Sequence, residues 1–422
     1  MAGFPGHSGP ATDRTAPTGR GDAPFRLLIM AGFASLTGDG IRMAALPLFT
    51  ALSTRSPLAV SAVATAEVLP WLLVALPAGA LVDRWSPRRV VLAAHCLRSL
   101  VAAALAVTVF TGHAQLPVLI GAAFLLTCGE TFADSAYQLL LVELSGRDRL
   151  DRANSWYVMA ETLGLDLGGP LVAAALFVWQ PGACFAVNAL TFLISAACVG
   201  FLPEVKVARG VPGPRQPPQP MRAQLAEGSR FLLRHRALRT LVLAVVASAL
   251  AVSAANALVS LYALQTLAVR AALVPTLWVA QALGTLFAAW LVPRLAARLG
   301  EGRTMVGALA LLGVAFVAVG AIPVAPAVWV AYLLVGVGAG GWNVLSATRR
   351  QRLTPSALMG RVTSAYRMLA WGLMPLGAAL AGPLARATSL ATVFVVVGGI
   401  VAAVAVVAAR PLARPAPEQV SR

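Results

Sequence analysis

The sequence predicts an all-α, polytopic membrane protein with twelve transmembrane helices in two pseudo-symmetric six-helix bundles. The chain of 422 residues is 59% hydrophobic and only 12% charged, and its mean hydropathy is +0.79. Soluble domains carry about 25% charged residues. Apolar stretches of spanning length recur along the chain, and arginines gather in the loops between them. These observations exclude a water-soluble fold.

The apolar stretches fall into two groups of six. A transmembrane helix needs about 20 predominantly apolar residues. The first group lies near residues 25–50, 57–82, 90–111, 117–140, 155–178 and 182–202. The second group lies near residues 238–262, 271–293, 304–322, 326–347, 361–384 and 388–409. The expected division is therefore an N-terminal bundle over 25–202 and a C-terminal bundle over 237–410.

The remaining segments are polar. Residues 1–24 are rich in Gly, Pro and Thr and are expected to form a disordered tail, and residues 411–422 form a second tail. Residues 203–236 join the bundles, first as a proline-rich extended linker and then as an amphipathic helix over 224–236. In that helix Leu225, Phe231 and Leu232 are expected to face lipid, with Arg230, Arg234 and Arg236 facing water.

The distribution of basic residues predicts the orientation. One set of loops holds most of the arginines, in clusters that begin at Arg84, Arg147, Arg294 and Arg349, whereas the other set holds only Arg55, Arg270 and Arg386. Loops rich in arginine stay in the cytoplasm. Both termini and the linker are therefore predicted to be cytoplasmic. The net charge of +17 is interpreted as topology, and a nucleic-acid partner is not expected.

The two halves share loop sequences, which predicts an internal repeat. Arg152, Ser155 and Tyr157 align at one constant offset with Arg361, Ser364 and Tyr366. A second pair of loops aligns Arg84 with Arg298 and Arg89 with Arg303, but Asp83 is replaced by Ala297. Two six-helix halves joined by a cytoplasmic linker are typical of secondary transporters with a midplane site.

The most specific motif lies between the second and third spans. It combines Gly79, Asp83, Arg84, Arg88 and Arg89 at the end of an apolar helix. A small residue permits close helix contact, and an acid at a helix end can meet a partner's N-terminal dipole. The spacing resembles the loop between helices 2 and 3 of the major facilitator superfamily. By this resemblance, Asp83 is expected to clamp helix 2 to helix 11 in the outward-facing state.

Further segments resemble the branch of siderophore and macrolide exporters. They are residues 185–192, 225–231 and 360–364. The resemblance implies a secondary active transporter of the plasma membrane that exports a drug-like or secondary-metabolite small molecule by alternating access, coupled to protons. A lysolipid or siderophore carrier is the alternative within transport, and a facilitator-like membrane receptor is the alternative from another class. A monomer in the lipid bilayer is expected.

Charged residues inside the spans are the candidates for coupling. Each costs about 2.5–3.5 kcal/mol at a helix centre and usually has a function. Asp39 and Arg42 share a face of helix 1, and Glu130 and Asp134 share a face of helix 4. Glu67 lies in helix 2, while Glu161 and Asp166 lie in helix 5. The proposed role is exchange between a proton and a cationic or polar substrate. The alternative is that Arg42 forms a structural pair.

Helix 5 contains Gly164, Gly168, Gly169 and Pro170, which resemble the glycine-proline motif of facilitator antiporters and are expected to allow close packing and a kink. The usual arginine of helix 4 is missing, because residues 125–128 before Gly129 are not basic. Gln281 and Asn343 are weaker candidates for the cavity wall.

Other function classes lack their motifs. The sequence has no phosphate-binding loop of the G-x-x-x-x-G-K-[ST] kind and no Ser/His/Asp set. Its four cysteines lack metal-ligand spacing. An enzyme, a cofactor and a metal site are therefore not expected.

Overall fold

The computed structural model describes residues 22–82, 85–145, 149–204, 221–355 and 358–413. These residues form helices and short connections, without a strand. The first half contains α1 (Asp22–Thr54), α2 (Pro57–Leu73), α3 (Ala75–Val82), α4 (Pro87–Phe110), α5 (Leu116–Ser145), α6 (Leu150–Ala160), the π-helix η2 (Glu161–Gly168), α7 (Gly169–Trp179) and α8 (Pro181–Gly200). The all-helical prediction is confirmed.

The second half repeats this plan after a short helix, α9 (Met221–Arg234). It contains α10 (Arg236–Gln265), the 3-10 turn η3 (Ala271–Leu273), α11 (Thr276–Leu299), α12 (Glu301–Ala321), α13 (Ala325–Leu353), α14 (Met359–Gly372), α15 (Met374–Ala387) and α16 (Leu390–Ala413). Packing is symmetric, since α4 lies against α8 as α12 lies against α16, and α2 lies against α5 as α11 lies against α13.

Within the described residues, eleven helical segments are long and apolar enough to cross a bilayer. The twelfth predicted span, residues 57–82, is divided into α2 and α3 at Val74. Pro77 has no N–H group to donate to the carbonyl of Leu73, so the regular hydrogen-bond ladder is interrupted there. The predicted twelve-helix fold is therefore confirmed, with a broken second helix.

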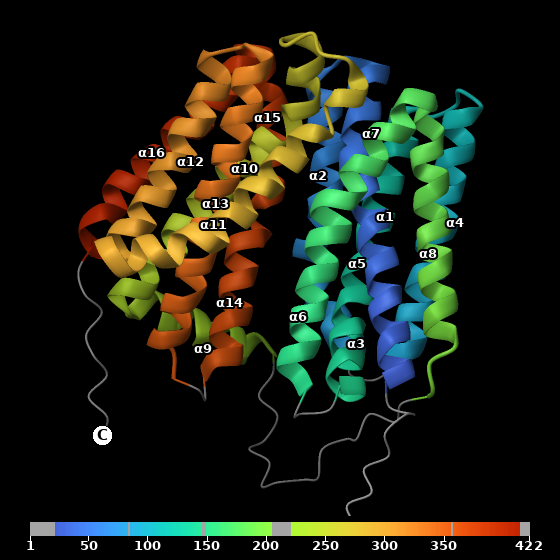
Figure 1. Ribbon diagram of the computed structural model, residues 1–422, viewed down its shortest axis with the longest axis horizontal. Coiled ribbons are helices and arrows are strands. Elements are labelled where there is room, and N and C mark those ends of the chain that lie inside the picture. The colour runs from blue at the N-terminus through green and yellow to red at the C-terminus, as the bar shows by residue number, and fades with distance from the viewer. Residues whose placement is uncertain (1–21, 83–84, 146–148, 205–220, 356–357, 414–422) are drawn as a thin grey trace, which may run out of the picture.

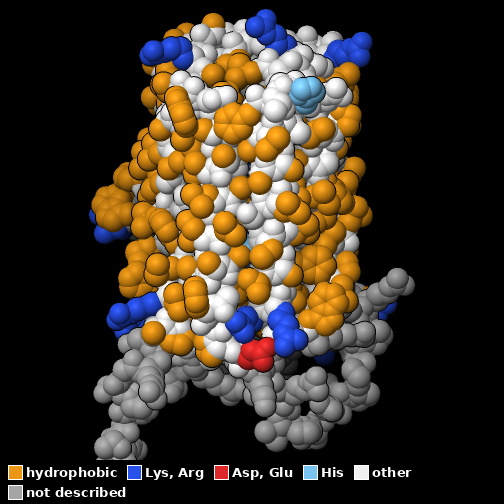
Figure 2. Space-filling model, turned by 90° about the vertical axis from the view of Figure 1, so that its right-hand side faces the viewer, with side chains coloured by type: hydrophobic (Ala, Val, Ile, Leu, Met, Phe, Trp, Pro, Cys, Tyr) orange, Lys and Arg blue, Asp and Glu red, His pale blue; other side chains and the backbone are white. Residues whose placement is uncertain are grey.

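The outer surface matches a bilayer environment. Figure 2 shows the face formed by α4 and α8, where hydrophobic side chains cover most of the surface and arginines lie near its two ends. Leucine and valine side chains such as Leu100 and Val107 of α4 are exposed on this surface. Contact of such a large apolar surface with water would be unfavourable, whereas contact with acyl chains is favourable.

The two halves meet at the end of the molecule opposite α9. There α2 packs along α15, and a Cβ atom added at Gly382 would lie 2.8 Å from the carbonyl oxygen of Pro57. The side-chain amide of Gln265 donates to the carbonyl of Arg55 at 2.9 Å. Nearer the other end, Trp71 contacts Trp371 edge to face, at a centroid distance of 5.6 Å. The halves diverge toward the end that carries α9 (Figure 1).

The linker helix α9 corrects one prediction. Its apolar face lies on the second half and not on lipid, because Leu232 is fully buried and Phe231 packs against the hydrophobic core. Glu227 also pairs with Arg361 of α14 at 2.5 Å. The surface of α14 offers apolar contact together with an ion-pair partner for Glu227. Acyl chains of lipid offer only the apolar contact. Arg230, Arg234 and Arg236 are exposed, as predicted.

Candidate functional site

Four of the predicted charged residues form one buried cluster in the first half. Arg42 of α1 lies at its centre, with a guanidinium nitrogen 3.0 Å from the Glu67 carboxylate of α2 and another 2.7 Å from the Glu130 carboxylate of α5. Asp39, one turn before Arg42, is 3.6 Å away. Asp39 and Arg42 are both buried. One arginine thus joins three helices through three carboxylates.

A second arginine, which sequence reasoning missed, completes the cluster. Arg98 of α4 is only 1% exposed. It pairs with Asp39, lies 3.7 Å from Glu130 and stacks over the ring of Phe192 at 4.0 Å. The signal was present, since Arg98 lies in the middle of the predicted apolar span 90–111. An isolated arginine there requires a buried acid as partner.

Gly129 explains how Arg98 reaches this position. A Cβ atom at Gly129 would lie 2.6 Å from Cγ of Arg98 and 3.0 Å from its Cδ. The glycine of α5 therefore leaves the space through which the stem of Arg98 passes from α4. The superfamily that the sequence resembles usually carries an arginine on helix 4 before this glycine, and the sequence lacks it. The structure supplies an arginine beside it from the neighbouring helix.

The fit between Gly129 and Arg98 gives a first prediction. Gly129→Ala should overpack this contact and lower the free energy of unfolding by about 1–3 kcal/mol. Gly121→Ala is the matched control, because it adds the same methyl group to the same helix where no atom lies within 4 Å. Thermal unfolding of the two purified variants measures the difference. Equal melting temperatures would show that Arg98 does not need this space.

The cluster holds more acid than base. Asp39, Glu67 and Glu130 supply three carboxylates against the two guanidinium groups of Arg42 and Arg98. Asp134, one turn beyond Glu130, makes no ion pair with any described residue, although the charges of Glu130, Asp39 and Arg98 act on it. The predicted face shared by Glu130 and Asp134 therefore adjoins the cluster. Because the carboxylates outnumber the guanidinium groups, at least one carboxylate has no arginine of its own as a partner.

The helix-packing residues lie where α1 crosses the fifth span. A Cβ atom at Gly169 would lie 2.5 Å from Cα of Gly40, so the two backbones touch. Gly164 packs in the same way against Thr37. Gly168 and Pro170 frame the end of η2, where the N–H of Gly169 donates to the carbonyl of Gly164 in a wide turn. The glycine-proline segment thus ends a π-helix and begins α7 with a proline in its first turn.

The loop motif is only partly described. Gly79 lies in α3, whereas Asp83 and Arg84 lie outside the described residues. Arg88 caps the last turn of α8, donating to the carbonyl oxygens of Val199 at 3.2 Å and Gly200 at 2.5 Å. Arg89 pairs with Glu204 at 2.8 Å on the exposed surface. Arg88 therefore acts on the C-terminal end of the last helix of the first half, and Arg89 on the segment that follows it.

A cavity of 260 Å³ lies between the halves. Gly40 and Met43 of α1 form one wall with Asp166 of η2, and Gln281 and Asn343 form part of the opposite wall. The indole of Trp278 and the hydroxyl-bearing side chain of Thr285 complete the opposite wall. The sequence had named Gln281 and Asn343 as weaker candidates, and Asp166 as a charged group in a span. The structure brings all three to one cavity.

Glu161 lies in η2, where the positive charge of Arg367 of α14 acts on its carboxylate. Arg367 itself lies over the ring of Trp371 at 5.2 Å.

Known proteins identify the family. The profile of the Major Facilitator Superfamily matches residues 28–379. The chain belongs to the major facilitator superfamily. It is 31% identical over 387 residues to "Multidrug efflux pump Tap" of Mycolicibacterium fortuitum, covering 88% of this chain and 91% of the relative. A protein of the same name from Mycobacterium tuberculosis (strain ATCC 25618 / H37Rv) is 28% identical over 386 residues, covering 88% and 89%.

Solved structures share the fold. The nucleoside transporter NupG superimposes with a TM-score of 0.74 at 13% identity, covering 93% of this chain and 100% of that chain. A bacterial homologue of the iron transporter ferroportin, in an inward-facing state, gives 0.71 at 18% identity, covering 93% and 98%. The superfamily match and the curated relatives show that this protein is a multi-pass membrane transporter and not an enzyme.

Proposed function

We propose that this transporter is a proton-coupled exporter of drug-like or secondary-metabolite small molecules, working by alternating access as a monomer in the plasma membrane. The superfamily membership and the relatives named as multidrug efflux pumps support export. The observation that carries proton coupling is the buried cluster of Asp39, Glu67 and Glu130 with Arg42 and Arg98. It contains one carboxylate more than guanidinium groups.

An excess carboxylate inside a low-dielectric bundle can take up a proton at a smaller cost than it can remain charged alone. Protonation would weaken its ion pair and change how α1, α2, α4 and α5 are held together, because Arg42 and Arg98 link these four helices. Helix α1 connects the cluster to the cavity, since Asp39 and Arg42 alternate along it with the cavity residues Gly40 and Met43.

The arrangement of the halves supports an inward-facing state. Contacts join α2 to α15 at the end opposite α9, and the positive-inside rule places the arginine-rich α9 end in the cytoplasm. In this proposal both termini and the 203–236 linker are cytoplasmic and join bundles over 25–202 and 237–410. Asp83, Arg84 and Gly79 would hold the second span against the eleventh span, which begins with α14, when the molecule closes at that end.

The cavity favours a cationic substrate with an aromatic part. Asp166 supplies a carboxylate, Trp278 an aromatic face, and Gln281 and Asn343 supply amides. Cations are attracted both to a carboxylate and to an indole face.

Export of ethidium by everted membrane vesicles tests this function. A proton gradient should drive ethidium uptake into vesicles that contain the wild type, and Asp166→Asn should reduce the rate about tenfold, as expected for loss of a hydrogen bond to a charged group. Glu301→Gln is the control, because Glu301 pairs with Arg352 at the start of α12, away from the cavity. Gradient-independent uptake by the wild type would overturn coupling, and an unaffected Asp166→Asn variant would overturn this substrate site.

A further inference from the structure

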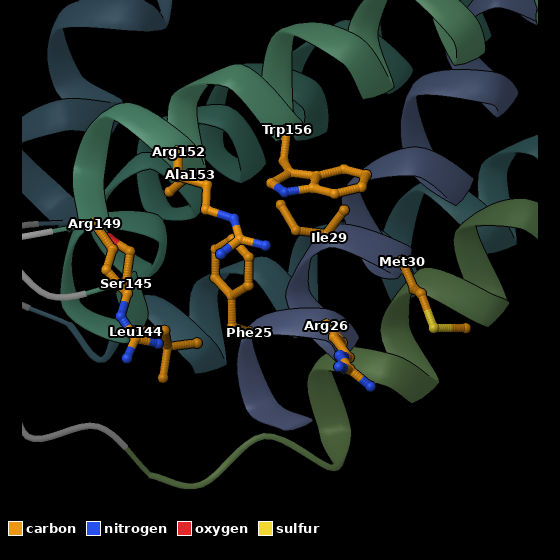
Figure 3. Close-up of a pocket in the computed structure, with 10 residues that line it drawn as sticks. All are labelled: Phe25, Arg26, Ile29, Met30, Leu144, Ser145, Arg149, Arg152, Ala153 and Trp156. Atoms are coloured by element: carbon orange, nitrogen blue, oxygen red, sulfur yellow. The ribbon is translucent and has the colours of Figure 1, made fainter. Parts of the chain in front are cut away.

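A second and larger cavity lies in the first half, at the end that carries α9. Its volume is 770 Å³. The first turns of α1 supply Phe25, Arg26 and Met30, and the first turns of α6 supply Arg149, Arg152 and Trp156, while the last turn of α5 closes one side. Figure 3 shows Arg152 directed from α6 toward Phe25 of α1, Arg149 directed toward Leu144 at the end of α5, and Arg26 on the other side of the pocket.

The lining is positively charged. Three of its ten residues are arginines, and none of the ten is acidic. Arg26 and Arg152 form no ion pair with any residue in the described part of the chain. The guanidinium groups of Arg26 and Arg152 repel one another unless an anion lies between them, so this site is suited to a phosphate or similar group.

An apolar surface continues from the pocket toward the middle of the molecule. The side chains that form it are all exposed: Met30 (59%), Phe33 (44%), Trp156 (41%), Met159 (41%) and Leu163 (49%). Their spacing along α1 and along α6 and η2 places them on one face of each helix. An indole at the edge of this surface is typical of the boundary between headgroups and acyl chains.

We propose that this pocket binds an anionic phospholipid of the adjacent leaflet. Arg26, Arg149 and Arg152 hold the phosphate of the headgroup, and an acyl chain lies along the stripe from Met30 to Leu163. The charge and the apolar stripe together require an amphiphile, since a free phosphate would use only the arginines. Because the pocket bridges α1 and α6, the bound lipid fastens the helix that carries Asp39 and Arg42 to the helix that leads into η2.

Lipid titration of the purified full-length protein in detergent tests this site. Phosphatidylglycerol should raise the melting temperature and remain bound in native mass spectrometry, whereas phosphatidylcholine should do so much more weakly. The double variant Arg26→Gln/Arg152→Gln should bind phosphatidylglycerol about 25-fold more weakly, since each surface arginine contributes about fivefold to binding of an anionic headgroup. Trp156→Ala should weaken binding of phosphatidylglycerol but not its preference over phosphatidylcholine.

The control is Arg298→Gln/Arg303→Gln, which removes the same charge from two exposed arginines at the end of α11 and the start of α12. It should bind phosphatidylglycerol like the wild type. An equal loss in this control would show that general surface charge, not the pocket, attracts the lipid. An equal response to phosphatidylcholine, or a full response to inorganic phosphate alone, would also overturn the proposal. Size-exclusion chromatography establishes that each variant is folded.

Discussion

Arg98→Leu should destabilise the first half by about 3–5 kcal/mol, because removing one partner of a buried ion pair leaves an uncompensated charge. The stranded group is Asp39, whose remaining basic partner, Arg42, is 3.6 Å away and already holds Glu67 and Glu130. Arg98 is 1% exposed, so water cannot replace it. Thermal unfolding in detergent, followed by size-exclusion chromatography, measures the loss.

A second substitution separates charge from packing. Asp39→Asn in the Arg98→Leu background removes the stranded charge and should recover part of the lost stability. Arg89→Leu is the control on the surface, because Arg89 and Glu204 form an ion pair with side chains 75% and 62% exposed, and it should melt close to the wild type. A wild-type melting temperature for Arg98→Leu would show that Asp39 does not depend on this arginine.

Glu130→Gln should abolish transport driven by a proton gradient while leaving substrate counterflow partly intact. Glu130 lies 2.7 Å from Arg42 and 3.7 Å from Arg98, so its charge bears on both cationic groups of the cluster. A glutamine keeps the shape but cannot take up and release the proton. Reconstituted vesicles permit both assays on one preparation, with substrate accumulation under a pH gradient compared with exchange at equal pH.

Asp134→Asn and the double variant extend this test, because Asp134 is the nearest acid without an ion pair in the described part of the chain. Both should lose the response to the gradient. Glu204→Gln, which neutralises an exposed acid of the same half, should retain it. If the two single variants and the double variant all respond fully to the gradient, the cluster is structural and coupling resides elsewhere.

The fold class could be predicted from the sequence because the bilayer restricts the backbone structures that can span it. A chain within lipid must satisfy its backbone hydrogen bonds internally, so each long apolar stretch becomes a helix. Twelve such stretches and arginine-rich loops were enough to predict the two six-helix halves. The division of the second span was harder to predict, since the effect of Pro77 is local and the stretch 57–82 is long and apolar enough to read as one helix.

The members of the cluster were mostly predictable, because a charge inside an apolar span stands out against its neighbours. Asp39, Arg42, Glu67 and Glu130 were found in this way. Their helical spacing also predicted the Asp39–Arg42 contact, since residues three apart share a face. Arg98 carries the same signal as the others, because it lies in the middle of the apolar stretch 90–111.

Tertiary packing alone decided which groups meet. Periodicity determines the face of a single helix, but the rotation and neighbours of that helix depend on side chains from distant segments. The sequence therefore determined that charges are buried in the first half, while packing decided that Arg98 passes over Gly129 to reach Asp39. In the same way the sequence determined that α9 is amphipathic, but only the surface of α14 decided that Leu232 is buried against protein instead of lipid.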